Sequence, residues 1–264
     1  AFGVKGIGIA TIISQFVSFL IILIKVLKNP RVLKITNEIL IPKFLYFKNI
    51  FFQSMPITVS ICGYALAAAI IFTYVGQSGE YAVAGYGVGT RIEQVVLLPI
   101  LGINTAIISI IAQNYGANKL LRIKETYFTA IKYAFIIMIT AGVLVFLSAS
   151  VITSFFSNDP EVIEYGKRYL KISAFVLPAY PVFFLSNGFF MALKKSENAM
   201  ISNFFRNVLN PIVVFYIAKY IDASFETFFW IWVCINWFFS ISYFFVVIYY
   251  FKVKLNKFST VIHP

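Results

Sequence analysis

The sequence predicts an all-α integral membrane protein, a polytopic bundle of helices. Of its 264 residues, 60% are hydrophobic and only 12% are charged, whereas a soluble domain is nearer half apolar and a quarter charged. The apolar residues gather in repeated runs of about 20 or more, the length that a helix needs to cross a bilayer. The short alternating segments that are typical of a membrane β-barrel do not occur.

Seven of these runs are long enough to be membrane spans, and the connections between them alternate in charge. The first connection is rich in lysine, the next carries only Glu80, and later basic and acidic or mixed connections continue the pattern. Because basic loops stay in the cytoplasm, the first and last spans run from outside to inside and the C-terminus is cytoplasmic. The expected spans are residues 7–27, 50–77, 86–113, 127–151, 168–193, 198–218 and 227–251.

Ala1 opens the sequence in place of Met, and no signal peptide follows it. We therefore expect a piece of a longer chain. If the full protein starts in the cytoplasm, the charge pattern requires an odd number of spans upstream, and a parent with twelve helices would lack five.

Residues suited to catalysis or metal binding are scarce. The single histidine is His263, Cys62 and Cys234 lie within expected spans, and there is no CxxC. No P-loop, GxSxG or carboxylate cluster occurs. We expect no enzyme, no metal and no cofactor. The net charge of +12 comes mostly from loops beside the spans, so it favours a membrane topology and no nucleic-acid partner.

Glu93 is the one acid that lies well inside an expected span. Ionisable groups in a bilayer are costly and face a cavity or a partner. Gln94 adjoins it, Arg91 lies nearer the outer end, and Asn104 is eleven residues further, about three turns along the same face. Two interpretations remain: a proton or cation site in a cavity, or a bond to a neighbouring helix that locks the bundle.

The sixth span carries a polar stripe, and several spans carry prolines. The spacing of three and four places the stripe on one helix face, toward water, polar partners or the hydrogen bonds of packed helices. The prolines suit hinges of a protein that changes state, and they also occur in static bundles. The stripe is Asn203, Arg206, Asn207 and Asn210, and the prolines are Pro56, Pro99, Pro178, Pro181 and Pro211.

Three stretches resemble the multidrug and toxic compound extrusion (MATE) transporters. Residues 82–125, AVAGYGVGTRIEQVVLLPILGINTAIISIIAQNYGANKLLRIKE, resemble helix 8 and its loop, with the pattern QNxGAxxxxR from Gln113 to Arg122. NDPEVIEYGKRYLKI, at 158–172, resembles the next extracellular loop and the start of helix 10. GVKGIGIATIISQ, at 3–15, resembles the start of helix 6. The basic turn at Lys194 and Lys195 departs from the family's Gly-rich turn.

The resemblance implies a MATE-like lobe and a transport function. Residues 1–29 would be the last helix of a truncated first lobe, 30–49 a basic cytoplasmic linker, and 50–264 the second six-helix lobe. The family exports amphipathic, often cationic compounds by alternating access, in exchange for H⁺ or Na⁺. The implied partners are a small-molecule substrate, the coupling ion, the lipid bilayer of the plasma or inner membrane, and the missing N-terminal lobe.

In one branch of the family, acids in helices 7 and 10 bind the coupling cation. The corresponding spans of this sequence, 50–77 and 168–193, have no acid in their interiors, and Tyr64 and Asn187 are among the polar groups there. Another branch couples through an aspartate in helix 1, which lies outside this sequence, and we therefore favour H⁺ coupling in the missing lobe. Aromatic walls at Phe183, Phe184, Phe189 and Phe190 would hold flat cations or simply pack. The candidate cavity residues are Tyr64, Arg91, Glu93, Gln94, Asn104, Tyr180, Asn187, Asn203, Arg206, Asn207 and Asn210.

Two other functions stay open at this point. A lipid-linked sugar flippase with a similar two-lobe fold would favour a basic cavity for pyrophosphate, and Arg91 and Arg206 are the only arginines within the spans. A membrane scaffold or receptor would need no coupling ion, and nothing in the sequence favours it.

Overall fold

The computed structural model describes residues 3–28 and 44–255. Most side chains of residues 44–61 are not included in this description. All regular secondary structure in these residues is helical, which confirms the predicted all-α class. The chain divides into two compact units, Ala1–Phe52 and Gln53–Pro264. Each unit is described by itself.

The first unit contains α1 (Gly3–Leu27) and the beginning of α2 (Phe44–Val75). From Gly8 to Lys25, α1 is long and apolar enough to cross a membrane. Helix α2 begins at Phe44, within the segment expected to be a linker at 30–49, and the linker stays a prediction. The remainder of that linker lies outside the described residues.

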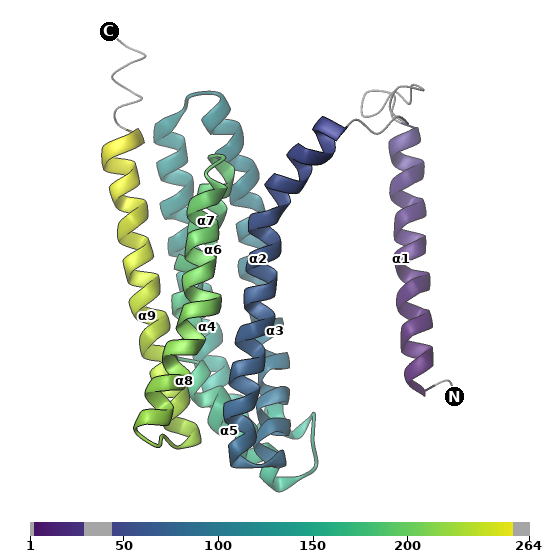
Figure 1. Cartoon of the computed structure of the whole chain (residues 1–264), viewed down its shortest axis with the longest axis vertical. Helices are drawn as coiled ribbons and strands as arrows, with labels where there is room; N and C mark the ends of the chain where they lie inside the picture. The colour runs from purple at the N-terminus through teal and green to yellow at the C-terminus, as the bar shows by residue number, and fades with distance from the viewer. Residues whose placement is uncertain (1–2, 29–43, 256–264) are drawn as a thin grey trace. The chain divides into compact units, whose positions relative to one another are not determined.

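The second unit is a bundle whose helices run alongside one another (Figure 1). Short 3₁₀ or π segments interrupt or extend several of them. The elements are the rest of α2, η2 (Gly76–Ser78), α3 (Glu80–Gly116), α4 (Leu120–Ser154), α5 (Pro160–Ser173), η3 (Leu177–Ala179), α6 (Tyr180–Ala192), α7 (Ser196–Phe204), η4 (Phe205–Leu209), α8 (Asn210–Tyr220), α9 (Phe225–Tyr250) and η5 (Phe251–Leu255).

Five of the seven expected spans coincide with stretches that are apolar and long enough to cross a membrane, counted over the described residues. The expected spans 50–77 and 198–218 are helical but are not in this set. The first falls on α2 and η2, where Cys62–Ser78 is a shorter apolar helix. The second falls on α7, η4 and α8, which carry the polar stripe. The five stretches are Gly8–Lys25, Glu80–Gly116, Leu120–Ser154, Pro160–Ala192 and Phe225–Val253.

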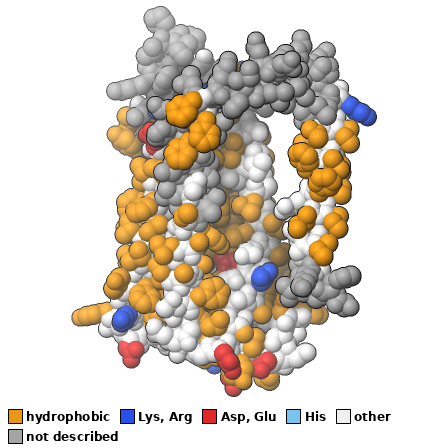
Figure 2. Space-filling view, turned by 45° about the vertical axis from the view of Figure 1, so that its right-hand side comes forward, with side chains coloured by type: hydrophobic (Ala, Val, Ile, Leu, Met, Phe, Trp, Pro, Cys, Tyr) orange, Lys and Arg blue, Asp and Glu red, His pale blue; other side chains and the backbone are white. Residues whose placement is uncertain are grey.

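The surface of the second unit fits a bilayer. In Figure 2, hydrophobic side chains are spread over the visible face of this unit, and several acidic side chains lie along its lower edge. The turn before α5 is polar because it caps a helix: the Asp159 side chain accepts hydrogen bonds from the N–H groups of Glu161 and Val162, and Pro160 occupies the first turn. Ser224 caps α9 in the same way through the N–H of Thr227.

Helix α3 packs against α4, α5 and α6 and so forms the centre of this unit. Small residues allow the closest approaches, as is usual between membrane helices. Gly85 of α3 lies against the backbone of α5 at Gly166 and Val162, and Gly142 of α4 lies against the carbonyl oxygen of Ala174. The close packing of α5 on α3 therefore depends on glycine at position 85, which has no side chain to separate the two helices.

The prolines fall at different kinds of places. Pro99 lies inside α3, where a proline removes a helical hydrogen bond. Pro178 belongs to η3, while Pro181 and Pro211 stand in the first turns of α6 and α8. Pro56 lies in α2, but its side chain is outside the described residues. Their role as hinges stays a prediction.

Gly85→Ala should destabilise the bundle. A Cβ there would lie 2.7 Å from the Gly166 nitrogen and 2.8 Å from the Val162 carbonyl oxygen, so α3 and α5 would have to separate, at a cost of about 1–3 kcal/mol. Thermal unfolding in detergent measures this effect. Gly87→Ala is the matched control, because nothing lies within 4 Å of its added Cβ. Equal midpoints for the two variants would contradict the packing argument.

Candidate functional site

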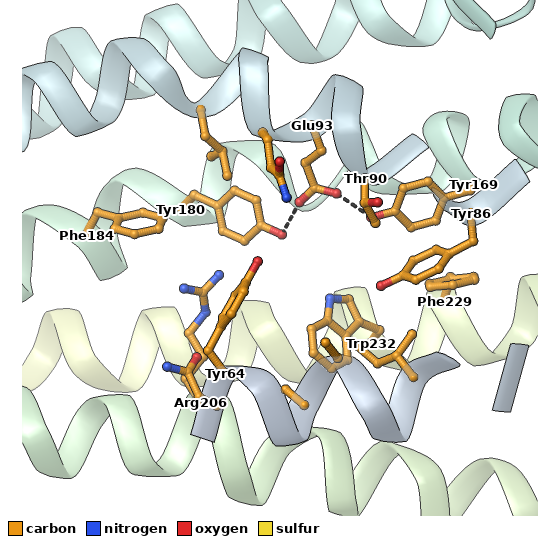
Figure 3. Close-up of a pocket in the computed structure, with 16 residues that line it drawn as sticks. Tyr64, Tyr86, Thr90, Glu93, Tyr169, Tyr180, Phe184, Arg206, Phe229 and Trp232 are labelled. Carbon is orange, nitrogen blue, oxygen red and sulfur yellow. Dashed lines mark hydrogen bonds between the residues drawn. The ribbon is translucent and has the colours of Figure 1, made fainter. Parts of the chain in front are cut away.

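A pocket of about 160 Å³ opens inside the second unit, among α2, α3, α5, α6, η4 and α9. Aromatic side chains form much of its wall, and Glu93 and Arg206 are its charged groups. Figure 3 shows Glu93 between Tyr169 and Tyr180, with Arg206 and Tyr64 across the pocket from it. We call this space the Glu93 pocket.

The Glu93 carboxylate is held by two tyrosine hydroxyls. Tyr169 donates a hydrogen bond to one carboxylate oxygen, and Tyr180 donates to the other at 2.5 Å. Hydrogen bonds to an ionised group are stronger than those between neutral groups. The two tyrosines thus satisfy the carboxylate without neutralising its charge.

Local packing sets the position of each tyrosine. Tyr169, on α5, packs edge-on against Tyr86 with 5.0 Å between ring centroids, and Gly89 leaves the space that its ring fills. Tyr180 is the first residue of α6, directly after η3. The break between α5 and α6 therefore lies between the two residues that bind the same carboxylate.

Arg206 lies on the π-helix η4 and stacks on aromatic rings. Its guanidinium carbon is 4.1 Å from the Phe183 ring centroid and 4.8 Å from that of Tyr180. Its Nε–H donates to Asn236 Oδ1 at 3.4 Å. Stacking of a cation on aromatic faces is favourable, and more so away from water.

Glu93 and Arg206 do not form an ion pair with each other. Within the described part of the chain, the ion pairs join Glu164 to Lys167 and Arg168, and Arg168 to Glu226. Both signs of charge therefore remain available to a ligand in the Glu93 pocket.

The structure brings together six of the expected cavity residues and places the others elsewhere. Arg91 is exposed and does not line the pocket, because residues two apart on a helix point to different sides. Asn104 does follow Glu93 along the face toward α6, but the pocket ends before it. Its Oδ1 lies against Gly188, without a hydrogen-bond partner in the described structure. The six lining residues are Tyr64, Glu93, Gln94, Tyr180, Arg206 and Asn207.

The polar stripe of the sixth span does not act as one surface, because the π-helix η4 interrupts the regular α-helical spacing. Asn203 accepts a hydrogen bond from Asn187 at 3.3 Å, and Tyr243 donates to Asn187 at 3.1 Å. These bonds join α7, α6 and α9. Asn210 is fully buried, and its amide has no partner among the described residues. Asn187 and Asn203 thus join neighbouring helices, and none of the three asparagines lines the Glu93 pocket.

The four phenylalanines proposed as aromatic walls separate into two pairs. Phe183 and Phe184 both face a cation, but that cation is Arg206 itself. Phe189 and Phe190 are fully buried in a second core cluster with Tyr127. The second pair is packing.

Sequence reasoning missed most of the aromatic wall and one ligand of the carboxylate. Tyr86 and Thr90 precede Glu93 by seven and three residues, so helical spacing alone would have found them. Tyr169, Phe229 and Trp232 come from other helices, and no spacing within the sequence relates them to Glu93.

The described residues contain no group of three or more His, Cys, Asp or Glu side chains that could hold a metal ion. Cys62 and Cys234 are exposed and unpaired. With one carboxylate, one guanidinium and aromatic walls, the pocket has the chemistry of a binding site.

Comparisons with known proteins agree on one family. The family model MatE matches residues 56–216. The chain is 25% identical over 158 residues to an FAD transporter of Shewanella oneidensis, covering 60% of this chain and 35% of that protein. It is 24% identical over 220 residues to a probable multidrug resistance protein NorM of Thermotoga maritima, covering 82% and 44%. The chain thus spans less than half the length of these relatives.

A solved structure shows the same fold. A crystal structure of MATE in complex with MaL6 superposes with a TM-score of 0.87 at 22% identity, covering 97% of this chain and 58% of that one. The family match covers more than half of the chain, and its helices are apolar enough to be embedded in a membrane. This chain belongs to the MATE family of membrane transporters.

Proposed function

We propose that this chain supplies the second lobe, at 50–264, of an exporter of drugs or amphipathic, often cationic metabolites. Export exchanges the substrate for H⁺ or Na⁺ by alternating access, in the plasma or inner membrane and with a cytoplasmic C-terminus. The observation that carries the proposal is a carboxylate inside an aromatic pocket of a MATE-family chain. A carboxylate and aromatic faces are the groups that attract organic cations.

The size of the Glu93 pocket supports a shared substrate site. Its volume of about 160 Å³ is below the roughly 300–1,000 Å³ of sites that enclose a drug-sized molecule. The pocket would therefore hold one part of the substrate, and the lobe outside this sequence would supply the rest.

Glu93 is the only acid that lines the pocket. Acids within membrane helices mark proton and ion pathways in pumps and transporters, so Glu93 is a candidate proton site beside the coupling expected in the missing lobe. We therefore favour H⁺ as the coupling ion. The relatives' names include drug and FAD transporters, and they do not favour a lipid-linked sugar flippase.

Glu93→Gln should reduce export of a cationic dye at least tenfold. The amide keeps the size of the side chain but loses the charge that attracts the cation, and a tenfold loss corresponds to about 1.4 kcal/mol. The assay uses the full-length protein in proteoliposomes, first with a proton gradient and then with a sodium gradient. Glu80→Gln, at the exposed start of α3, is the matched control. Unchanged export by Glu93→Gln would refute a role for the carboxylate.

Tyr180→Phe should lower stability more than an exposed tyrosine change does. The substitution keeps the ring beside Arg206 and removes one hydrogen bond to the carboxylate, which costs about 1.5–3 kcal/mol. Thermal unfolding of the purified protein measures the loss. Tyr216→Phe, on α8 and 67% exposed, should leave the midpoint unchanged. A similar midpoint for both variants would show that the Tyr180 bond contributes little.

A further inference from the structure

A second cavity, of about 310 Å³, lies among α6, α7, η4 and α9, on another side of Arg206. Its wall is mainly apolar, with Phe183, Ile201, Phe239 and Val246 among the lining side chains. We call it the α7–α9 cavity. It shares Arg206 and no acid with the Glu93 pocket.

The rim of the α7–α9 cavity faces outward. Ile201, Phe205 and Val246 line it and are 43–50% exposed. Their helices belong to a bundle that is apolar enough to be embedded in a membrane, and these side chains leave an apolar opening on the surface of the described unit. A molecule that is dissolved in the bilayer can enter from that side without crossing water.

The charge of the cavity is positive. Arg206 is its only charged lining residue, and the described chain places no carboxylate within 4.0 Å of that guanidinium. Its side chain has five N–H donors, and one of them reaches Asn236. Glu93 faces the guanidinium across the Glu93 pocket (Figure 3), and the side of the guanidinium toward the α7–α9 cavity meets no acid that lines that cavity. The partner that fits a guanidinium best is a planar carboxylate, through two parallel hydrogen bonds.

We propose that the α7–α9 cavity binds a single-chain amphipathic carboxylate from the bilayer. The carboxylate lies at Arg206, beside the hydroxyls of Ser202 and Ser242, and the hydrocarbon follows the apolar wall past Val246. The volume is near the lower end of small-molecule sites, which suits one short chain. This binding goes beyond the proposed export of cations and does not require it.

The test is equilibrium binding of radiolabelled dodecanoate to the full-length protein in phosphatidylcholine nanodiscs. Dodecanol and dodecyltrimethylammonium serve as neutral and cationic probes of the same chain length. Dodecanoate should bind at least tenfold more tightly than either. Arg206→Gln should abolish that preference, and Arg206→Lys should retain part of it because the charge remains.

A second pair of variants tests the cavity without changing the charge. Val246→Trp fills the rim and should weaken dodecanoate binding at least tenfold. Ile241→Trp is the control, because Ile241 is on the same helix, is 49% exposed against 48% for Val246, and lines neither cavity. Equal binding of the three probes, or equal binding by the two tryptophan variants, would overturn the proposal. Dye export is measured in a separate assay. Dodecanoate binding can therefore be interpreted even if the protein does not export the dye.

Discussion

The site depends on keeping the Glu93 carboxylate inside a membrane helix. An ionised group there is unfavourable unless other polar groups replace water. Two tyrosine hydroxyls do this, one from α5 and one from the start of α6. Their arrangement needs the helix break at η3 and the close packing of α5 on α3, which Gly85 and Gly89 permit. The close packing of the helices at these glycines thus determines which hydroxyl groups bind the Glu93 carboxylate.

The sequence predicts the bundle well because each helix that crosses a bilayer needs a continuous run of about 20 apolar residues, and such runs can be recognised without the structure. Apolar runs and charged connections located most of the helices, and the rarity of acids singled out Glu93. The ligands of that acid were not predictable in the same way. Tyr169 and Trp232 approach it from other helices, and tyrosine is common throughout this chain. Asn104 was placed on the correct face but beyond the end of the pocket, because helical spacing gives direction and not the length of a cavity.

The π-helix η4 explains why the polar stripe was only partly predicted. A regular α-helix would keep Asn203, Arg206 and Asn210 on one face. Residues 205–209 form a π-helix instead, and a π segment changes the direction of the side chains that follow it. Asn203, which precedes the π-helix, bonds to α6, whereas Arg206 within it reaches both cavities and Asn210 after it is buried. Pi-helical turns are frequent at functional sites, and this one carries the basic group of the site.

Arg206 connects the two cavities through aromatic stacking. The Tyr180 ring lies beneath its guanidinium, and the Tyr180 hydroxyl binds Glu93. The acid and the base are therefore joined through one tyrosine without forming an ion pair. A direct ion pair would neutralise both groups and leave the pocket with little attraction for charged ligands. Separation by Tyr180 instead leaves the carboxylate in the Glu93 pocket and the guanidinium shared between that pocket and the α7–α9 cavity, which is the arrangement on which both proposals rest.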